Sequence, residues 1–155
     1  MTASPPGGAE AAAWIDGASR GNPGEAGFGV VFERDGEIEE IGGFLGRTTN
    51  NVAEYSALLA ALSHAERTGV RRLRLYSDSE LLVRQMSGEY RVKAAHLVPM
   101  YLRVLELKRR VPKLELRHVP RAENRRADAL ANRAIDERLP VPAWLELEAR
   151  SPARR

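Results

Sequence analysis

Apolar and polar residues follow the pattern of extended strands along the first third of the chain. The segments 11–16, 28–34 and 37–45 are rich in aliphatic and aromatic residues and are bounded by turn signals. Asn22-Pro23-Gly24 follows the first segment, and Asp35-Gly36, a dipeptide typical of tight hairpins, joins the second segment to the third. The chain is therefore predicted to open with an antiparallel meander of three strands.

The apolar period changes to that of a helix at residues 50–66, NNVAEYSALLAALSHAE, with Gly69 as a helix stop. The residues that share one helix face with Glu54 are all apolar: Leu58, Ala61, Leu62 and Ala65. A carboxylate at the end of such a face is costly to bury without a positive partner. Two interpretations of Glu54 stay open at this point: an acid favoured by the helix dipole in a first turn, or a functional acid.

Helices and strands alternate in the rest of the chain. Residues 70–78 alternate leucine with arginine and form a strand that follows a helix, so we expect it to run parallel to the first strand. The further predicted elements are a helix at 79–88 capped by Ser79, a helix at 96–110, a strand at 113–119 and a helix at 124–138 capped by Asn124. This order predicts an α/β fold in which helices flank a five-stranded mixed sheet, a three-strand antiparallel meander plus two parallel strands.

The composition is that of one globular domain, with 155 residues, 43% hydrophobic and 29% charged. We expect a flexible N-terminus at 1–10, the folded domain at 11–138 and a C-terminal tail at 139–155, of which Trp144, Leu145 and Leu147 could dock on the body. No apolar run approaches the roughly 18 residues of a membrane span, and the start of the chain lacks the features of a secretion signal. With no cysteine, disulfides and thiolate metal sites are excluded. We therefore expect a cytoplasmic monomer without membrane contact.

The basic residues are unevenly placed, although the net charge is only +3. Arginine far outnumbers lysine, and the basic residues cluster at 71–74, 103–110, 117–126 and in the tail. Arginine-rich patches suit phosphate groups. Because most charge clusters are solvated faces, charge alone is a modest argument for nucleic-acid binding.

Four carboxylates are predicted to meet at one edge of the sheet. Asp16 and Asp78 each end a predicted strand, and ligands of open α/β sheets gather outside the carboxyl ends of the parallel strands. Asp128 has apolar residues at i+3 and i+7, so it points to the apolar side of its helix, as Glu54 does. Each acid has an alternative structural role, as a turn residue, a neighbour of a helix cap or a dipole-stabilised acid. Their joint occurrence at one edge favours a shared site.

Carboxylates packed together repel one another, and without cations some of them would have to take up protons. Mg²⁺ or Mn²⁺ takes oxygen ligands and keeps exchangeable waters. Two such ions about 3.5–4 Å apart can activate a water and stabilise the leaving oxygen in a displacement at phosphorus. The four acids therefore predict a site for two divalent ions, Mg²⁺ or Mn²⁺, that acts on a phosphodiester.

The sequence resembles type 1 ribonuclease H domains over residues 11–137. Four segments carry the resemblance: IDGASRGNPGEAGFG with Asp16, TTNNVAEYSALLAAL with Glu54, YSDSELLVRQ with Asp78, and HVPRAENRRADALANRA, in which His118 precedes Asp128 by ten residues. The resemblance implies a ribonuclease H-like fold, the four acids as catalytic metal ligands, and His118 as a proton carrier or product-release aid.

The resemblance also implies a substrate. It implies an endoribonuclease that hydrolyses the RNA strand of RNA–DNA hybrids to 5′-phosphate and 3′-hydroxyl ends by a two-metal mechanism. Asn22, Asn50 and Asn51 would hold the substrate backbone and RNA 2′-hydroxyls, and Thr49 a DNA phosphate. Without the resemblance, Thr49 to Asn51 would be interpreted as a polar loop before a helix, and His118 as a hydrogen-bonded histidine at a strand end.

Two features depart from the family pattern. Members with a basic protrusion carry an extra helix, which is absent here because RVKAAHLVPMY leads directly into the next helix. Hybrid binding would then fall to other basic residues, such as Arg84, Arg91, Lys93 or Arg121. Glu80 also stands where some relatives have Gln, and an ionised acid cannot donate a hydrogen bond to a base.

Two alternatives to a hybrid-specific nuclease stay open. One is a catalytically idle nucleic-acid-binding module of the same fold, against which the complete set of four acids argues, since a pure binder gains nothing from carboxylates that face a polyanion. The other is a nuclease that also cuts double-stranded RNA, because both duplexes present A-form-like minor grooves.

Overall fold

The computed structural model describes residues 10–145 and 147. Its elements in chain order are β1 (Glu10–Gly21), β2 (Gly24–Arg34), β3 (Glu37–Thr48), α1 (Asn50–Arg67), β4 (Arg72–Ser77), α2 (Glu80–Met86), the 3₁₀ turn η1 (Ala95–Leu97), α3 (Val98–Lys108), β5 (Lys113–His118), the 3₁₀ turn η2 (Arg121–Glu123) and α4 (Arg125–Asp136). The predictions for residues 1–9 and for 148–155 lie outside the described residues.

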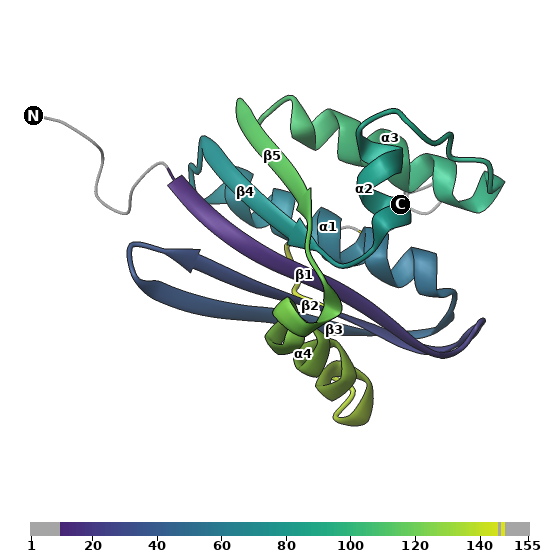
Figure 1. The fold of residues 1–155 in the computed structure, drawn as a ribbon. Coiled ribbons are helices and arrows are strands. Elements are labelled where there is room, and N and C mark those ends of the chain that lie inside the picture. The colour runs from purple at the N-terminus through teal and green to yellow at the C-terminus, as the bar shows by residue number, and fades with distance from the viewer. Residues whose placement is uncertain (1–9, 146, 148–155) are drawn as a thin grey trace, which may run out of the picture.

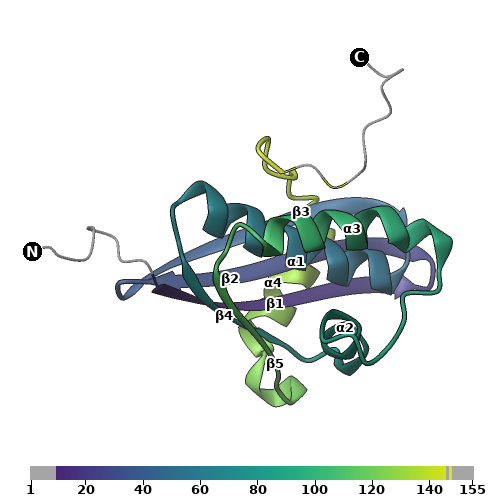
Figure 2. The same ribbon diagram turned by 90° about the horizontal axis from the view of Figure 1, so that it is seen from above.

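The five strands form one mixed sheet in the order β3-β2-β1-β4-β5. β1 to β3 are antiparallel, and β4 runs parallel to both β1 and β5. Figure 1 shows α1 and α3 on one side of this sheet and α4 on the other, and in the view from above in Figure 2 α1 and α3 lie in front of the strands and α4 behind them. The predicted five-stranded α/β sheet is therefore confirmed.

The main core lies between the sheet and α1, where Phe28, Phe32, Leu58, Leu62 and Leu75 are fully buried. A smaller apolar cluster of Val31, Ala127 and Leu130 lies under α4, with Trp14 packed against it. Strands buried on one side by a long helix and on the other by a short one need apolar residues at most positions. This arrangement explains why β1 and β2 show little of the alternation expected for a solvated strand.

β1 is longer than predicted, and this corrects the expectation that Asp16 ends the first strand. Pairing with β2 continues without a break from Ala12↔Glu33 to Gly21↔Gly24. Pairing with β4, by contrast, stops at Ile15↔Ser77. Asp16 therefore lies inside β1, at the point where the neighbouring parallel strand ends, because the hairpin partner extends the strand past that point.

The helix predicted at 96–110 is present with most of its predicted inner face. It begins at Val98 after the 3₁₀ turn. Of the six residues expected on its inner face, Leu97, Met100 and Val104 are buried, whereas Tyr101, Leu105 and Lys108 are half-buried. The buried positions are Leu97, Met100, Val104 and Leu107. These residues follow the i, i+3, i+4 spacing of a single apolar face.

The described part of the C-terminal segment packs on the body. The backbone N–H of Phe44 donates to the carbonyl of Leu139 over 2.7 Å, and Leu145 is buried in the main core. The guanidinium of Arg67 lies 4.4 Å from the ring centre of Trp144, a cation–π contact. Among the described residues, no helix has the length and apolar character needed to cross a membrane.

Candidate active site

The two strand acids lie side by side at one edge of the sheet. Ile15 and Ser77 are the last register pair of β1 and β4, Asp16 follows the first of them, and Asp78 follows β4 directly. Asp16 is buried, with 8% of its surface exposed. The predicted meeting of Asp16 and Asp78 at the carboxyl end of the parallel strands is therefore present in the structure.

Two glycines bring the other two acids to this edge. A Cβ added to Gly17 would lie 2.3 Å from the carbonyl carbon of Ala53 in α1, and a Cβ added to Gly29 would lie 2.8 Å from the carbonyl oxygen of Ala127 in α4. Any side chain at either position would push its helix away. Glu54 and Asp128 each follow the contacted alanine by one residue, so the close approach of both helices positions both acids.

The electrostatics of Asp16 show that the four acids share one site. Burial, the charge of Asp78, a hydrogen bond with Asp128 and the charge of Glu54 together raise the pKa of Asp16 to about 9. A hydrogen bond between two carboxyl groups requires a proton on one of them. Without a cation, the site therefore holds a proton at neutral pH.

Glu54 shows the same effect more weakly. Burial raises the pKa of Glu54 to about 7, a hydrogen bond with Ser79 opposes this, the charge of Asp78 adds to it, and a hydrogen bond from Asn50 opposes it again. The helix-dipole interpretation of Glu54 does not account for these shifts, because a dipole lowers the pKa of an acid at a helix start. Glu54 belongs to the acid group.

The donor set fits hard divalent cations, because it consists only of carboxylate oxygens. Among the described residues, no three His, Cys, Asp or Glu side chains already form a metal cage. Mg²⁺ is commonly held by one or two carboxylates together with water and substrate phosphates. An open set of acids that share protons, rather than a closed cage, suits that kind of coordination.

Asn124 fixes the start of α4, in a way that corrects its predicted role as a side-chain cap. Its side chain makes no capping hydrogen bond; instead its Nδ2 donates to the carbonyl of Ile15 over 2.9 Å. The residue is only 1% exposed, and its Oδ1 has no hydrogen-bond partner among the described residues. Asn124 thus ties α4 to the residue before Asp16, a contact that sequence analysis missed.

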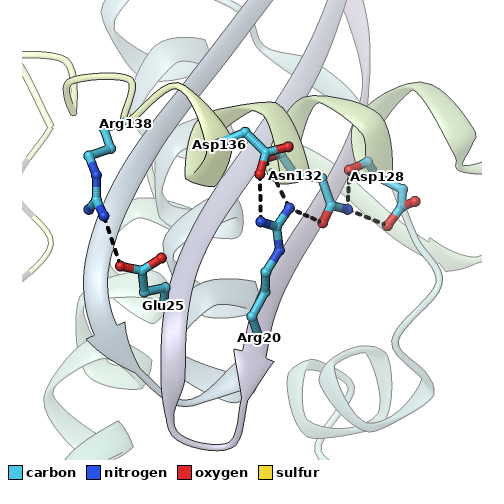
Figure 3. A network of polar contacts seen from close by, with 6 residues as sticks. All are labelled: Arg20, Glu25, Asp128, Asn132, Asp136 and Arg138. Atoms are coloured by element: carbon cyan, nitrogen blue, oxygen red, sulfur yellow. Dashed lines mark hydrogen bonds and ion pairs between the residues drawn. The ribbon is translucent and has the colours of Figure 1, made fainter.

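A polar network joins the far end of β1 to the fourth acid (Figure 3). Arg20 donates to Asp136 over 2.5 Å and to Oδ1 of Asn132 over 3.1 Å. Nδ2 of Asn132 in turn donates to the carbonyl of Asp128 over 3.0 Å and to its Oδ1 over 3.4 Å. Only the i, i+4 spacing of Asp128 and Asn132 is visible in the sequence, since Arg20 lies more than a hundred residues away.

The predicted substrate-binding residues gather at the start of α1. Oδ1 of Asn22 accepts from the backbone N–H of Asn50 over 3.0 Å, and Oγ1 of Thr49 accepts from Val52 over 3.2 Å. Nδ2 of Asn50 donates to Oε2 of Glu54 over 3.2 Å. Asn51 is half-buried in the same turn. The structure brings these polar residues next to an active-site acid, and their binding of substrate stays a prediction.

His118 lies on the exposed rim of the same edge. It is the last residue of β5 and pairs with Ser77, the residue before Asp78. Its side chain is exposed. An exposed imidazole on the rim is free to move toward a bound substrate, and its role in turnover stays a prediction.

The basic residues considered for hybrid binding differ in whether they already make ion pairs. Arg84 pairs with Glu80 and with Glu89, each over 2.7 Å, and lies over the ring of Tyr90. It therefore braces the segment after α2 rather than facing a ligand. Three others are exposed and make no ion pair within the described part of the chain: Arg91, Lys93 and Arg121.

Comparisons with protein families and with individual proteins identify relatives of this chain. A family model described as "Reverse transcriptase-like" matches residues 14–134, a range that contains the four acids and His118. The chain is 46% identical over 127 residues to ribonuclease HI of Halobacterium salinarum, which covers 81% of this chain and 64% of that protein. It spans 34% of the length of the next curated relatives, from Mycobacterium.

Solved structures agree with these sequence relatives. The crystal structure of RNase H1 from Halobacterium salinarum NRC-1 matches with a TM-score of 0.78 and 45% identity, over 83% of this chain and 98% of that chain. LC11-RNase H1, crystallised in complex with an RNA/DNA hybrid, matches with a TM-score of 0.76 and 42% identity, over 82% of this chain and 97% of that chain.

Proposed function

Because this chain belongs to the ribonuclease H family, we propose that it is a metal-dependent endonuclease that hydrolyses the RNA strand of RNA–DNA hybrids, leaving 5′-phosphate and 3′-hydroxyl ends. The observation that carries the proposal is the convergence of Glu54 from α1, Asp78 after β4 and Asp128 from α4 on Asp16 in β1, whose pKa all three affect. Such a concentration of acids is costly for the fold alone.

The four acids would act together as ligands of two Mg²⁺ or Mn²⁺ ions. Asp16 in β1 and Asp78 directly after β4 would share the ions, while Glu54 and Asp128 would complete the set from the two helices. When bound, the ions would supply an activated water and stabilise the leaving oxygen of the phosphodiester. The protein's own contribution is to hold four carboxylates at one edge and to release their protons when the ions bind.

The polar residues at the start of α1 would hold the substrate. The amides of Asn22, Asn50 and Asn51 can both donate and accept hydrogen bonds, which suits RNA 2′-hydroxyls, and Thr49 suits a DNA phosphate. His118, on the rim, would carry a proton or aid product release. In place of a basic protrusion, the exposed Arg91, Lys93 and Arg121 would contact phosphates.

The two alternatives make different predictions. An idle binding module would hold a hybrid and cut nothing, and a broader nuclease would also cut double-stranded RNA. LC11-RNase H1 was crystallised with an RNA/DNA hybrid, which favours the hybrid as the substrate of this chain. We propose that the enzyme works as a monomer in the cytoplasm.

The test is the cleavage of end-labelled duplexes of RNA–DNA, double-stranded RNA and double-stranded DNA, with Mg²⁺, Mn²⁺ or EDTA. We expect metal-dependent cutting of the RNA strand of the hybrid alone. Asp78→Asn is the matched variant and should cut nothing while still binding the hybrid. Binding without cutting under either metal would replace the proposal with the idle module.

A further inference from the structure

One side of β4 and β5 carries no helix within the described part of the chain. Helix α4 packs on β1, β2 and β3, and in Figure 1 it lies below β4 and β5. Along β4 the residues alternate strictly: Leu73 and Leu75 are buried toward α1, while Arg72 and Arg74 are exposed on the side of α4. The outward residues of β4 and β5 therefore form an open sheet face.

The strand register places the outward residues in three rows across β1, β4 and β5. The rows are Glu10–Arg72–Lys113, Ala12–Arg74–Glu115 and Trp14–Tyr76–Arg117. Register partners on neighbouring strands point to the same face of a sheet. We call this surface the basic strip and define it by Trp14, Arg72, Arg74, Tyr76, Lys113 and Arg117.

The charge of the basic strip is positive and only partly paired. Arg72 pairs with Glu10 over 3.2 Å, and Arg117 with Glu115 over 2.8 Å. Arg74 and Lys113 are exposed and make no ion pair among the described residues. A surface cavity of about 490 Å³ is lined by Arg72, Arg74 and Lys113 together with Glu10 and Glu115, the acids that pair with Arg72 and Arg117. The two unpaired cations at this cavity leave it suited to an anionic partner.

The last row adds a stacking surface. The rings of Trp14 and Tyr76 are stacked with their centres 5.2 Å apart and an angle of 22° between their planes. Both residues are half-buried, so part of each remains open to solvent. Arg117 lies next to Tyr76 in the register. Aromatic rings bordered by arginine bind nucleic-acid bases with little regard to sequence.

The basic strip is continuous with the acid site. Trp14 precedes Asp16 by two residues on β1, and Tyr76 precedes Asp78 by two residues, and residues two apart on a strand share a face. Arg72 lies six residues before Asp78, about 20 Å along the strand at roughly 3.3 Å per residue. The basic strip thus starts beside the acids and runs along β4 toward the amino-terminal end of that strand.

We propose that the basic strip binds single-stranded nucleic acid, with bases stacked on Trp14 and Tyr76 and phosphates held by Arg74 and Lys113. A strand that leaves the acid site would then be held along β4. Since stacking and phosphate contacts carry no information on the sugar, we expect DNA and RNA strands to bind alike. This binding is separate from the proposed cleavage and does not depend on it.

The test uses fluorescence anisotropy with 5′-fluorescein-labelled single-stranded 15-mers of DNA and of RNA, in EDTA so that no strand is cut. The variant is Arg74→Glu. Its matched control is Arg109→Glu on the other helical layer, because both arginines are exposed and neither makes an ion pair among the described residues. We expect Arg74→Glu to weaken both strands roughly fivefold to tenfold, with a shallower salt dependence, and the control to weaken them less than about twofold.

A second variant tests the aromatic part. Tyr76→Ala should weaken single-strand binding roughly fivefold or more, the loss expected for one stacked base, with little change in the salt dependence. If Arg74→Glu lowers the melting temperature, Arg74→Gln replaces it, since Gln adds no acid beside Glu115. Unchanged binding in both Arg74 and Tyr76 variants, or an equal loss in the Arg109 control, would overturn the proposal.

The outcomes for the strip and for the proposed cleavage can be separated. If the protein cuts no hybrid but its Arg74→Glu variant binds single strands more weakly, the proposal for the basic strip stands and the nuclease proposal fails. If the protein cuts a blunt hybrid while its Arg74 and Tyr76 variants bind single strands normally, the nuclease proposal stands and the proposal for the basic strip fails.

Discussion

Two groups of charged side chains that lie near β1 and α4 are held in opposite ways. In the network of Figure 3, Asp136 has Arg20 as its cation and Glu25 has Arg138. Asp128, about two turns before Asp136 in α4, belongs to the acid site instead. The charges that act on Asp16 in that site are all negative. Paired surface charges cost little and contribute little, whereas buried like charges oppose folding. The difference indicates that the acid group is kept for a ligand and the network for local structure.

The largest expected effect comes from removing one acid of the unpaired group. Asp16→Asn should reduce hybrid cleavage by at least about a thousandfold, equivalent to about 4 kcal/mol in the activation barrier, and leave hybrid binding in place. Asp136→Asn is the control, since it removes an acid of the paired network, and it should cleave at nearly the normal rate. A single-turnover assay measures both, and an Asp16→Asn enzyme that kept most of its rate would contradict the assignment.

A smaller effect on cleavage is expected for His118. His118→Ala should slow turnover about tenfold to a hundredfold without abolishing it, because the imidazole assists proton transfer or product release rather than holding the ions. Steady-state cleavage of the hybrid measures the change, with His96→Ala as a control at another exposed histidine. An unchanged rate would return His118 to a structural role at the end of β5.

Asn124, which joins α4 to β1, should matter chiefly for stability. Asn124→Ala removes the buried donor to the carbonyl of Ile15, so the free energy of unfolding should fall by about 1–3 kcal/mol. Urea denaturation followed by circular dichroism measures it. Asn124→Asp keeps the size but not the donor and should behave like the alanine variant; a stable Asn124→Asp protein would show that the hydrogen bond is unimportant.

The raised pKa values give a pH dependence of known sign. The folded protein holds a proton on Asp16 up to a pKa of about 9 and on Glu54 up to about 7, while the unfolded chain releases both near pH 4. The folded state therefore binds more protons between about pH 4 and pH 9, and its stability falls as the pH rises through that window.

Thermal melting of the protein in EDTA, from pH 5 to pH 9, measures this dependence. The melting temperature should decrease with rising pH, and the decrease should be smaller with saturating Mg²⁺ and in Asp16→Asn. A melting temperature in EDTA that rose over the same range would contradict the shared protons.

The smallest effect is expected in the paired network. Arg20→Ala removes the donors to Asn132 and Asp136, and Asp128 keeps its hydrogen bond from Asn132. Cleavage should slow at most about tenfold, as for other residues that orient a metal ligand from outside. Mg²⁺ titration of the cleavage rate is the informative measurement, because a positioning role shifts the Mg²⁺ dependence and a purely structural role does not.

Much of the fold could be predicted because its signals are local. The Asp35-Gly36 turn is an example: both residues have positive φ values, 56° and 78°, as its dipeptide predicts for a tight hairpin. Ser79 caps α2 as predicted, with its Oγ accepting from Leu82 over 3.1 Å. The order of strands and helices then limited the topology to few possibilities.

The site was predicted less completely, because its geometry depends on distant contacts. The four acids were identified from their place at strand ends and on apolar helix faces. The length of β1, however, depends on its pairing with β2, which continues the strand beyond Asp16. Asn124 was identified as a cap from its position before a helix, whereas its side chain bonds to β1. No local pattern distinguishes these two roles of an asparagine.

By itself, the sequence indicated which residues could carry the chemistry, through the apolar periods and the strand-end positions of the acids, and for His118 through the resemblance to ribonuclease H domains. Only the tertiary structure decided how close the acids come, since α1 and α4 approach the sheet over Gly17 and Gly29. It also decided that Arg72 and Arg74 lie on an open sheet face that continues to the acids. The physical reason is that periodicity reports which side of an element is buried, while distances between elements depend on packing between residues far apart in the chain.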